Sequence, residues 1–201
     1  GREMQKITLA SASPRRRELL GRLLSEFSVM ADDTPEIKIE GEDPKAMVQR
    51  LAMEKAVHIA EKVTDGLVIG ADTVVVSDNR VLGKPKDREE AKTMLAALSG
   101  RAHSVLTGIA VVDAKSGAAC GDVAETMVQF RRLCAEEIDA YIASGEPMDK
   151  AGAYGIQELG ALFVEGIRGD YFNVVGLPLC RLDKLLKEKF SFDLLTARTT
   201  D

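Results

Sequence analysis

The chain has 201 residues, of which 45% are hydrophobic and 29% charged, a composition typical of a globular protein with a buried core. Its formal net charge of -5 argues against a nucleic-acid-binding protein, because a surface that contacts many phosphates is normally basic. No apolar run is long enough to span a bilayer, and no signal-peptide core is evident. We therefore expect a cytoplasmic protein without a membrane partner.

Cysteine and histidine are scarce. The three cysteines, Cys120, Cys134 and Cys180, are widely spaced and form no CxxC pattern, so we expect buried small side chains and no disulfides. His58 and His103 are the only histidines, which argues against a zinc site. For His103 we favour a structural hydrogen bond over a ligand contact.

The first predicted strand covers residues 6–10, and a helix follows it. Ser13 is a good N-cap and Pro14 suits the first helical position. The polar side chains gathered there are the hydroxyls of Ser11 and Ser13 and the guanidinium groups of Arg15, Arg16 and Arg17. With free backbone N–H groups and the helix dipole, they favour phosphate binding. The alternative is a solvated basic turn, but cations there oppose the dipole unless an anion binds.

A short strand over residues 27–31 and an acidic loop over residues 32–43 come next. A second helix is predicted from Asp43 to about residue 63. Lys55 falls on its apolar stripe. Because lysine is rarely buried alone, Lys55 either extends past the core to solvent or meets a negative charge. The sequence leaves both alternatives open.

The apolar run over residues 67–76 predicts a strand buried on both faces of an α/β sheet. Asp72 and Thr73 interrupt this run near its middle. We expect Asp72 to stand where the strand leaves the sheet, since open α/β sheets bind ligands beyond the carboxyl ends of their strands. Asp72 is therefore a candidate for metal binding or water activation, with a capping or turn aspartate as the alternative.

A hairpin turn over residues 77–80 leads to a short returning strand over residues 80–85. Lys84 precedes Pro85, which favours an extended backbone and fixes the direction of the lysine. Taken alone, Lys84 fits an exposed lysine at a strand end. Asp87 then opens a helix that ends at residues 99–100.

The second half of the chain continues the alternation of strands and helices. The expected elements are a twisted antiparallel hairpin over residues 103–113 and 120–133, a helix over 135–144, a loop over 146–157, a strand over 161–167, a second loop over 169–178 and a helix to about 190. The first loop is rich in glycine and charge, a composition that often carries function. Gln157 there offers both an amide donor and a carbonyl acceptor for reading the edge of a base.

Short motifs along the chain together resemble those of the Maf-type nucleotide pyrophosphatases, a family of the inosine-triphosphate-pyrophosphatase-like α/β class. The motifs are Ser11-Ala-Ser-Pro-Arg-Arg16, Leu51-Ala with Lys55-Ala56, Gly70-Ala-Asp-Thr73, Gly83-Lys-Pro85, Ser99-Gly with His103 and Thr107-Gly108, Glu146-Pro-Met-Asp-Lys-Ala-Gly152, Tyr154-Gly-Ile-Gln157 and Asn173-Val-Val-Gly-Leu-Pro178. They occur in the family's order over roughly residues 7–186.

The resemblance implies a twisted mixed sheet flanked by helices, with two lobes and the active site in the cleft between them. It implies one catalytic domain over residues 1–190 and a C-terminal tail over 191–201. The implied reaction is hydrolysis of a nucleoside triphosphate to the monophosphate and pyrophosphate, assisted by Mg²⁺, Mn²⁺ or Co²⁺. Asp72 would be the proton acceptor, and Lys55 and Lys84 would support the phosphates.

Three positions separate the branches of this family, and Arg15, Thr73 and Gln157 occupy them here. This combination resembles the branch acting on dTTP and UTP, with modified pyrimidine triphosphates as further candidates. The branch that prefers 7-methyl-GTP typically carries tryptophan, glutamine and glutamate there.

The phosphates would be held by Ser11, Ser13, Arg15 and Arg16, and the base would be read by Thr73 and Gln157. Metal ligands would be Asp72 and Glu36, although the sequence Asp32-Asp-Thr-Pro-Glu36 departs from the family's usual Asp-Glu pair. The alternative function is a nucleotide-binding regulatory protein linked to the arrest of cell division. The sequence leaves the oligomeric state open, with a homodimer, the commonest arrangement of soluble oligomers, as one candidate.

Overall fold

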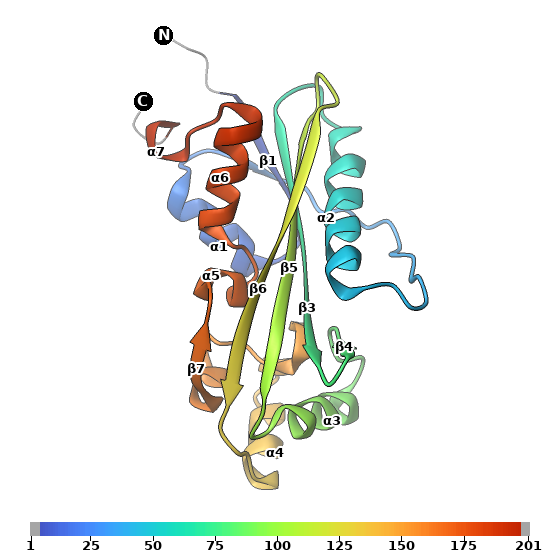
Figure 1. Ribbon diagram of the computed structural model, residues 1–201, viewed down its shortest axis with the longest axis vertical. Helices are drawn as coiled ribbons and strands as arrows, with labels where there is room; N and C mark the ends of the chain where they lie inside the picture. The colour runs from blue at the N-terminus through green and yellow to red at the C-terminus, as the bar shows by residue number, and fades with distance from the viewer. Residues whose placement is uncertain (1–4, 198–201) are drawn as a thin grey trace. The chain divides into compact units, whose positions relative to one another are not determined.

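The computed structural model describes residues 5–197 and shows an α/β fold with one mixed sheet (Figure 1). The described strands are β1 (Ile7–Ala10), β2 (Ser28–Val29), β3 (Leu67–Ser77), β4 (Arg80–Leu82), β5 (Ala102–Asp113), β6 (Ala119–Phe130) and β7 (Val164–Arg168). Their order in the sheet is β2-β1-β3-β5-β6-β7, and β4 pairs with β3. The pairing of β1 with β2 and β3 is parallel, whereas β3–β4 and β6–β7 are antiparallel. The mixed sheet expected from the sequence is therefore confirmed.

Helices alternate with these strands along the chain. They are α1 (Pro14–Leu23), α2 (Pro44–Ala60), α3 (Arg88–Leu98), α4 (Ala135–Ala143), α5 (Tyr171–Val175), α6 (Leu179–Phe190) and α7 (Leu194–Ala197), with 3-10 turns η1 (Glu146–Asp149), η2 (Ala151–Ala153) and η3 (Leu159–Phe163). The predicted N-caps are in place, because Ser13, Asp43 and Asp87 each accept a backbone N–H of the first helical turn. No helix within residues 5–197 is long and apolar enough to cross a membrane.

The chain divides into two compact units, and the division falls between Asp72 and Thr73. The first unit contains Gly1–Asp72, Thr107–Ala124 and Gly176–Asp201, and the second contains Thr73–Leu106 and Glu125–Val175. The cleft expected from the family resemblance stays a prediction.

The core of the first unit depends on a close approach of α2 to the sheet. A Cβ atom added at Gly70 of β3 would lie 2.3 Å from the carbonyl oxygen of Ala52 in α2. At Gly108 of β5, the corresponding distance to the carbonyl oxygen of Val48 is 2.2 Å. Only glycine permits this contact. The helix therefore lies against the strands through backbone atoms and small side chains such as Ala52 and Ala56.

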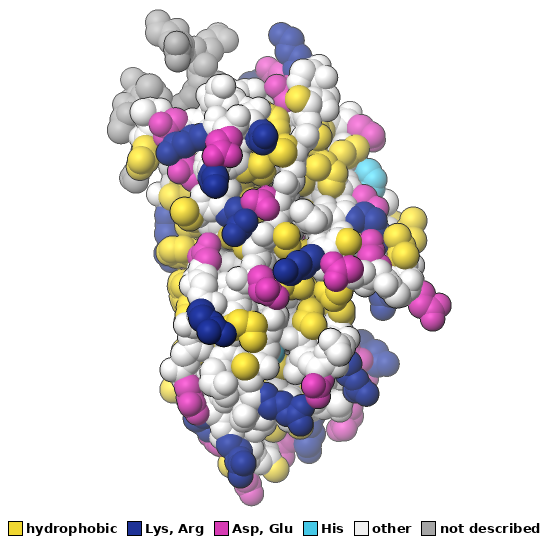
Figure 2. Space-filling model, in the orientation of Figure 1, with side chains coloured by type: hydrophobic (Ala, Val, Ile, Leu, Met, Phe, Trp, Pro, Cys, Tyr) yellow, Lys and Arg dark blue, Asp and Glu magenta, His cyan; other side chains and the backbone are white. Residues whose placement is uncertain are grey.

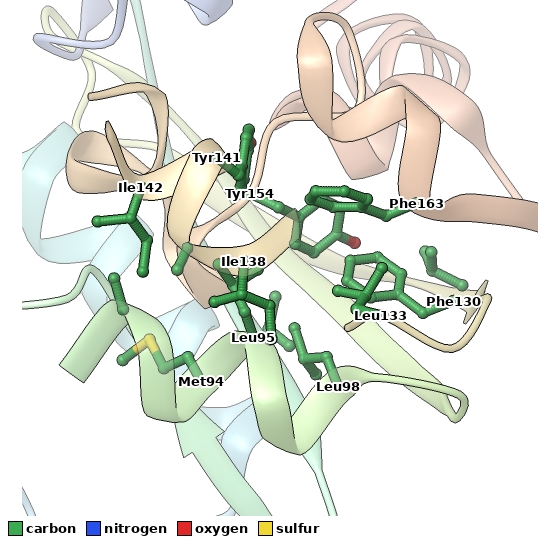
Figure 3. Close-up of a cluster of buried hydrophobic side chains, with 14 of the residues drawn as sticks. Met94, Leu95, Leu98, Phe130, Leu133, Ile138, Tyr141, Ile142, Tyr154 and Phe163 are labelled. Atoms are coloured by element: carbon green, nitrogen blue, oxygen red, sulfur yellow. The ribbon is translucent and has the colours of Figure 1, made fainter. Parts of the chain in front are cut away.

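The second unit has its own core, formed by α3, α4 and aromatic side chains. Figure 3 shows Leu95 and Leu98 of α3, Ile138 of α4 and Phe130 of β6 in one cluster of buried side chains. His103, predicted to make a structural hydrogen bond, lies in this core, and its Nε2 is 2.6 Å from the Tyr154 hydroxyl. Burial lowers the pKa of His103 to about 4, so its imidazole is neutral at physiological pH.

Several sequence-based expectations are wrong in detail. Strand β3 does not end at Asp72, because it continues to Ser77 and pairs with β4. The last strand begins at Val164, after the η3 turn. The two segments expected to be loops contain η1, η2 and α5, and α7 forms within the expected tail. The cysteines are free, as predicted, but Cys134 and Cys180 are exposed and Cys120 is partly exposed.

Candidate active site

Asp72 lies at a change in the pairing of β3. The parallel register with β1 ends at Gly70, and the antiparallel register with β4 begins at Val75. Because side chains alternate along a strand, Asp72 projects to the same face as Gly70. That is the face on which α2 lies, so the glycine contact brings the helix beside the carboxylate.

Lys55 of α2 meets this carboxylate. Its Nζ atom lies 2.8 Å from Asp72 Oδ1 and 3.3 Å from the carbonyl oxygen of Ala71, to both of which it donates. The same Nζ is 3.4 Å from Glu36 Oε1. Exposure of the side chains is 21% for Lys55 and 12% for Asp72, so the pair is largely shielded from solvent. The structure therefore selects the second of the two sequence-based alternatives for Lys55, a contact with negative charge.

The protonation of Asp72 reflects this environment. Burial raises the pKa of Asp72 above its usual range, and the negative charge of Glu36 adds to the rise. Lys55 and Arg16 oppose the shift by favouring the charged carboxylate. A raised pKa makes the carboxylate a stronger base than an exposed aspartate, and this is the property that proton abstraction from water requires.

Glu36 is brought to Lys55 by a loop that is tied to α2. Arg50 of α2 donates to both carboxylate oxygens of Glu42 at 2.8 and 2.9 Å and to the carbonyl oxygen of Ile37 at 3.0 Å. Farther along the helix, His58 Nδ1 lies 2.9 Å from Asp32 Oδ2. These contacts flank Glu36 in the chain and hold its loop beside the helix, while 53% of the Glu36 side chain is exposed.

Asp72 and Glu36 suit one kind of metal ion better than others. Residues 5–197 contain no group of three histidine, cysteine, aspartate or glutamate side chains able to hold a metal. Such a closed site is what structural zinc would need. Mg²⁺ instead takes one or two carboxylates and completes its coordination with substrate phosphates and water. The two carboxylates on either side of Lys55 fit that pattern.

The start of α1 differs from the expectation of free backbone donors. Ser11 Oγ accepts the Ser13 N–H at 3.1 Å, and Ser13 Oγ accepts the Arg16 N–H at 3.3 Å. Both N–H groups are therefore already bonded. Each hydroxyl still has its own proton to donate, and accepting an N–H bond polarises the hydroxyl toward donation. The serine hydroxyls can thus serve an anion directly.

Arg16 places its charge near Asp72. The Arg16 Nε–H donates to the carbonyl oxygen of Gly176 at 2.7 Å, which fixes the guanidinium plane. Burial lowers the pKa of Arg16, and the positive charge of Arg15 lowers it further, whereas Asp72 opposes the shift. Both arginines are partly buried, and the charge of Arg16 acts directly on Asp72.

Lys84 and Thr73 belong to the second unit. Lys84 is exposed and makes no hydrogen bond or ion pair with any residue from 5 to 197. The carbonyl oxygen of the preceding Gly83 accepts the Gly152 N–H at 3.1 Å. Gly152 also packs on Val75, where an added Cβ would lie 2.6 Å from the nearest methyl. Because Val75 and Thr73 share one face of β3, the loop carrying Gly152 lies on the Thr73 side.

Gln157 lies in a turn of the second unit, half-buried. Its side chain makes no hydrogen bond with the described part of the chain, so both its amide donor and its carbonyl acceptor are available to a ligand. In the first unit, Lys55 contacts both Asp72 and Glu36, and the charge of Arg16 acts on Asp72. That Lys84, Thr73 and Gln157 lie together in the second unit stays a prediction.

Sequence reasoning missed Tyr141 and Glu146, which hold the Gln157 turn through hydrogen bonds to residues on either side of it. Glu146 belongs to the motif over residues 146–152, but nothing local in the sequence assigns it a role. The N–H groups that Glu146 accepts belong to Leu159 and Gly160. These residues are too distant in the chain for a short sequence motif to reveal the contact.

A family model described as "Maf-like protein" matches residues 6–189. The dTTP/UTP pyrophosphatase of Moorella thermoacetica is 55% identical over 183 residues, covering 91% of this chain and 94% of that protein. The dTTP/UTP pyrophosphatase of Clostridioides difficile is 50% identical over 188 residues, covering 94% and 97%.

One solved structure shows a similar fold. A HAM1 protein from Coxiella burnetii superposes with a TM-score of 0.53 at 20% sequence identity, covering 92% of this chain and all of that chain. This similarity supports the inosine-triphosphate-pyrophosphatase-like architecture expected from the sequence.

Proposed function

Because the chain belongs to the Maf family, we propose that it is a nucleoside triphosphate pyrophosphatase acting on dTTP and UTP. The products are the nucleoside monophosphate and pyrophosphate. Identity of 50% or more to proteins of that name, over nearly the full length of both chains, supports the assignment. The observation that carries the chemistry is the buried pair of Lys55 and Asp72, with Nζ and Oδ1 2.8 Å apart.

Asp72 acts as the base. The raised pKa of Asp72 gives its carboxylate a higher proton affinity than an ordinary aspartate has. The carboxylate therefore accepts a proton from water more readily. Lys55 keeps the carboxylate ionised and fixes its direction. When Asp72 takes the proton, the remaining hydroxide forms a bond to a phosphorus atom at the bridge between the α- and β-phosphates. The bond from that phosphorus to the bridging oxygen breaks, which releases the nucleoside monophosphate and pyrophosphate.

Phosphate charge is met by the first turn of α1. The hydroxyls of Ser11 and Ser13 donate to phosphate oxygens, and Arg15 and Arg16 supply positive charge. In phosphoryl transfer, positioning and charge neutralisation provide most of the rate, because the protein has little covalent chemistry to perform. Lys55 and Lys84 offset the charge that develops on the departing pyrophosphate.

Asp72 and Glu36 would hold a divalent cation, Mg²⁺, Mn²⁺ or Co²⁺, together with the substrate phosphates. Such an ion, when bound, neutralises phosphate charge and lowers the pKa of a coordinated water. Lys55 lies within reach of both carboxylates, so it holds them in place before substrate arrives.

Thr73 and Gln157 read the pyrimidine, through a hydroxyl and an amide that can each donate and accept. The partner is thus a small nucleotide, canonical or modified in the base. The proposal includes no nucleic-acid partner. Basic and acidic side chains are interspersed on the face shown in Figure 2, and the net charge is -5. A cytoplasmic homodimer completes the proposal.

A screen of nucleoside triphosphates with detection of pyrophosphate tests the function. The purified protein is incubated with each nucleotide and with magnesium, manganese or cobalt in turn. We expect pyrophosphate release to be fastest from dTTP and UTP and to require the cation. A protein that bound these nucleotides in single-turnover assays without releasing pyrophosphate would be a regulatory nucleotide sensor instead, possessing the pocket without the reaction.

A further inference from the structure

The turn that carries Gln157 is anchored on both sides. Before it, the Gly155 N–H donates to the Tyr141 hydroxyl oxygen at 3.0 Å. After it, the N–H groups of Leu159 and Gly160 donate to the two carboxylate oxygens of Glu146 at 2.8 and 3.1 Å. The two anchoring side chains come from the end of α4 and the start of η1, five positions apart in the chain.

The two anchors are coupled to each other. Burial raises the pKa of the Tyr141 hydroxyl, and a hydrogen bond to Glu146 adds to the rise. The Tyr141 hydroxyl thus accepts the Gly155 N–H, and the carboxylate of Glu146 lies close enough to act on it. Its ring packs edge-on against Phe163, with 4.9 Å between ring centroids, inside the core shown in Figure 3. The hydroxyl is therefore held by packing at one end and by hydrogen bonds at the other.

Lys150 also helps to hold Glu146 and the backbone at Gly155 in place. Its Nζ donates to the carbonyl oxygen of Glu146 and to Asp149 Oδ1, each at 2.9 Å, and only 8% of its side chain is exposed. The aliphatic part of Lys150 crosses Gly155, where an added Cβ would lie 2.5 Å from Lys150 Cε. A larger residue at position 155 would therefore force the lysine side chain to shift.

We propose that Tyr141 and Glu146 are positioning residues that fix the Gln157 turn and thereby set the selectivity for pyrimidine nucleotides. The inference rests on the proposed function and deepens it. Gln157 makes no hydrogen bond with the described residues, so the direction of its amide depends on the backbone that carries it. Small displacements of a recognition group are enough to lose substrate discrimination.

Substitutions at the two anchors test this role. Glu146→Gln keeps the shape but offers one acceptor oxygen to two N–H donors, and Tyr141→Phe keeps the ring but removes the acceptor for Gly155. Glu165→Gln is the matched control, because it removes one exposed carboxylate from β7 of the same unit. Circular dichroism and thermal melting establish that each variant is folded.

For both anchor variants, we expect kcat/KM for UTP relative to GTP to fall about tenfold, through a higher KM for UTP with kcat within about twofold. The control keeps the wild-type ratio. A uniform loss of kcat for all nucleotides with the ratio unchanged would overturn the inference. If Glu146→Gln does not fold, the Tyr141→Phe result decides alone.

A double substitution separates positioning from a general effect. Introduced into a Gln157→Ala protein, Glu146→Gln should not lower the UTP to GTP ratio further, because the group that it positions is gone. A further drop of similar size would contradict the inference. If Gln157→Ala itself kept the wild-type ratio, the base-reading role of Gln157 would fail and the inference with it, while the pyrophosphatase function would stand. If the wild-type protein released no pyrophosphate, the proposed function itself would fail.

Discussion

Lys55 Nζ lies 2.8 Å from Asp72 Oδ1, and this contact joins helix α2 to strand β3 at the centre of the candidate active site. It forms because Gly70 and Gly108 let the helix backbone approach the sheet. The lysine therefore meets the carboxylate at a fixed distance, whereas an exposed ion pair would exchange among many geometries.

Replacing Lys55 with methionine keeps the length of the side chain and removes its charge. We expect kcat to fall about 100-fold, because Asp72 loses its fixed partner and the departing pyrophosphate loses a cation. Initial rates of pyrophosphate release from UTP measure the effect. Lys62→Met, which removes an exposed lysine just beyond α2, serves as the control and should leave the rate unchanged.

The raised pKa of Asp72 predicts the pH dependence of the reaction. The base must be deprotonated, so kcat/KM increases as pH rises through the pKa of Asp72. The rising limb should lie above the ordinary aspartate value of about 4, because burial stabilises the protonated form. In the Lys55→Met variant, the rising limb of the pH profile should move to still higher pH, because the charge that lowers the pKa of Asp72 is gone. A limb that stays in place in this variant would show that another group limits the profile.

Gly70→Ala tests the contact between helix and sheet. The new Cβ would be 2.3 Å from the carbonyl oxygen of Ala52, so α2 must move. We expect the free energy of unfolding to decrease by about 2–3 kcal/mol, with loss of activity as Lys55 is displaced. Denaturant titration gives the first quantity. Gly166→Ala on β7 is the control, since an added Cβ there meets nothing within 4 Å.

The base-reading role of Gln157 is tested by Gln157→Glu, which places a carboxylate where the amide donor was. We expect the ratio of kcat/KM for UTP over other nucleoside triphosphates to fall about tenfold, while the rates for weak substrates change little. Measurement of kcat/KM over a panel of nucleotides settles the point. An unchanged ratio would mean that Gln157 does not contact the base.

Much of this fold follows from local signals in the sequence. Ser13, Asp43 and Asp87 begin helices because a side-chain oxygen satisfies a free N–H of the first turn, a property of adjacent residues. The end of β3 could not be predicted in the same way. Asp72 looked like a strand terminus, but the strand continues because residues 75–77 pair with β4.

The site residues show the same limit. The position of Lys55 on an apolar stripe was visible in the sequence, but its partner, 17 residues away, required the fold. Helix α5 was hidden among glycines, although Asp170 Oδ1 accepts the Phe172 N–H at 2.8 Å at its start. Glu146 gave no local signal, because its N–H donors are 13 and 14 residues away.

Asp72→Asn tests the central claim most directly, because the substitution preserves shape and removes the base. With UTP and magnesium, we predict that pyrophosphate release falls at least about 1,000-fold. The Kd for UTP, measured by calorimetry, should stay within about threefold of the wild-type value. A folded Asp72→Asn protein that released pyrophosphate at the wild-type rate would contradict the account.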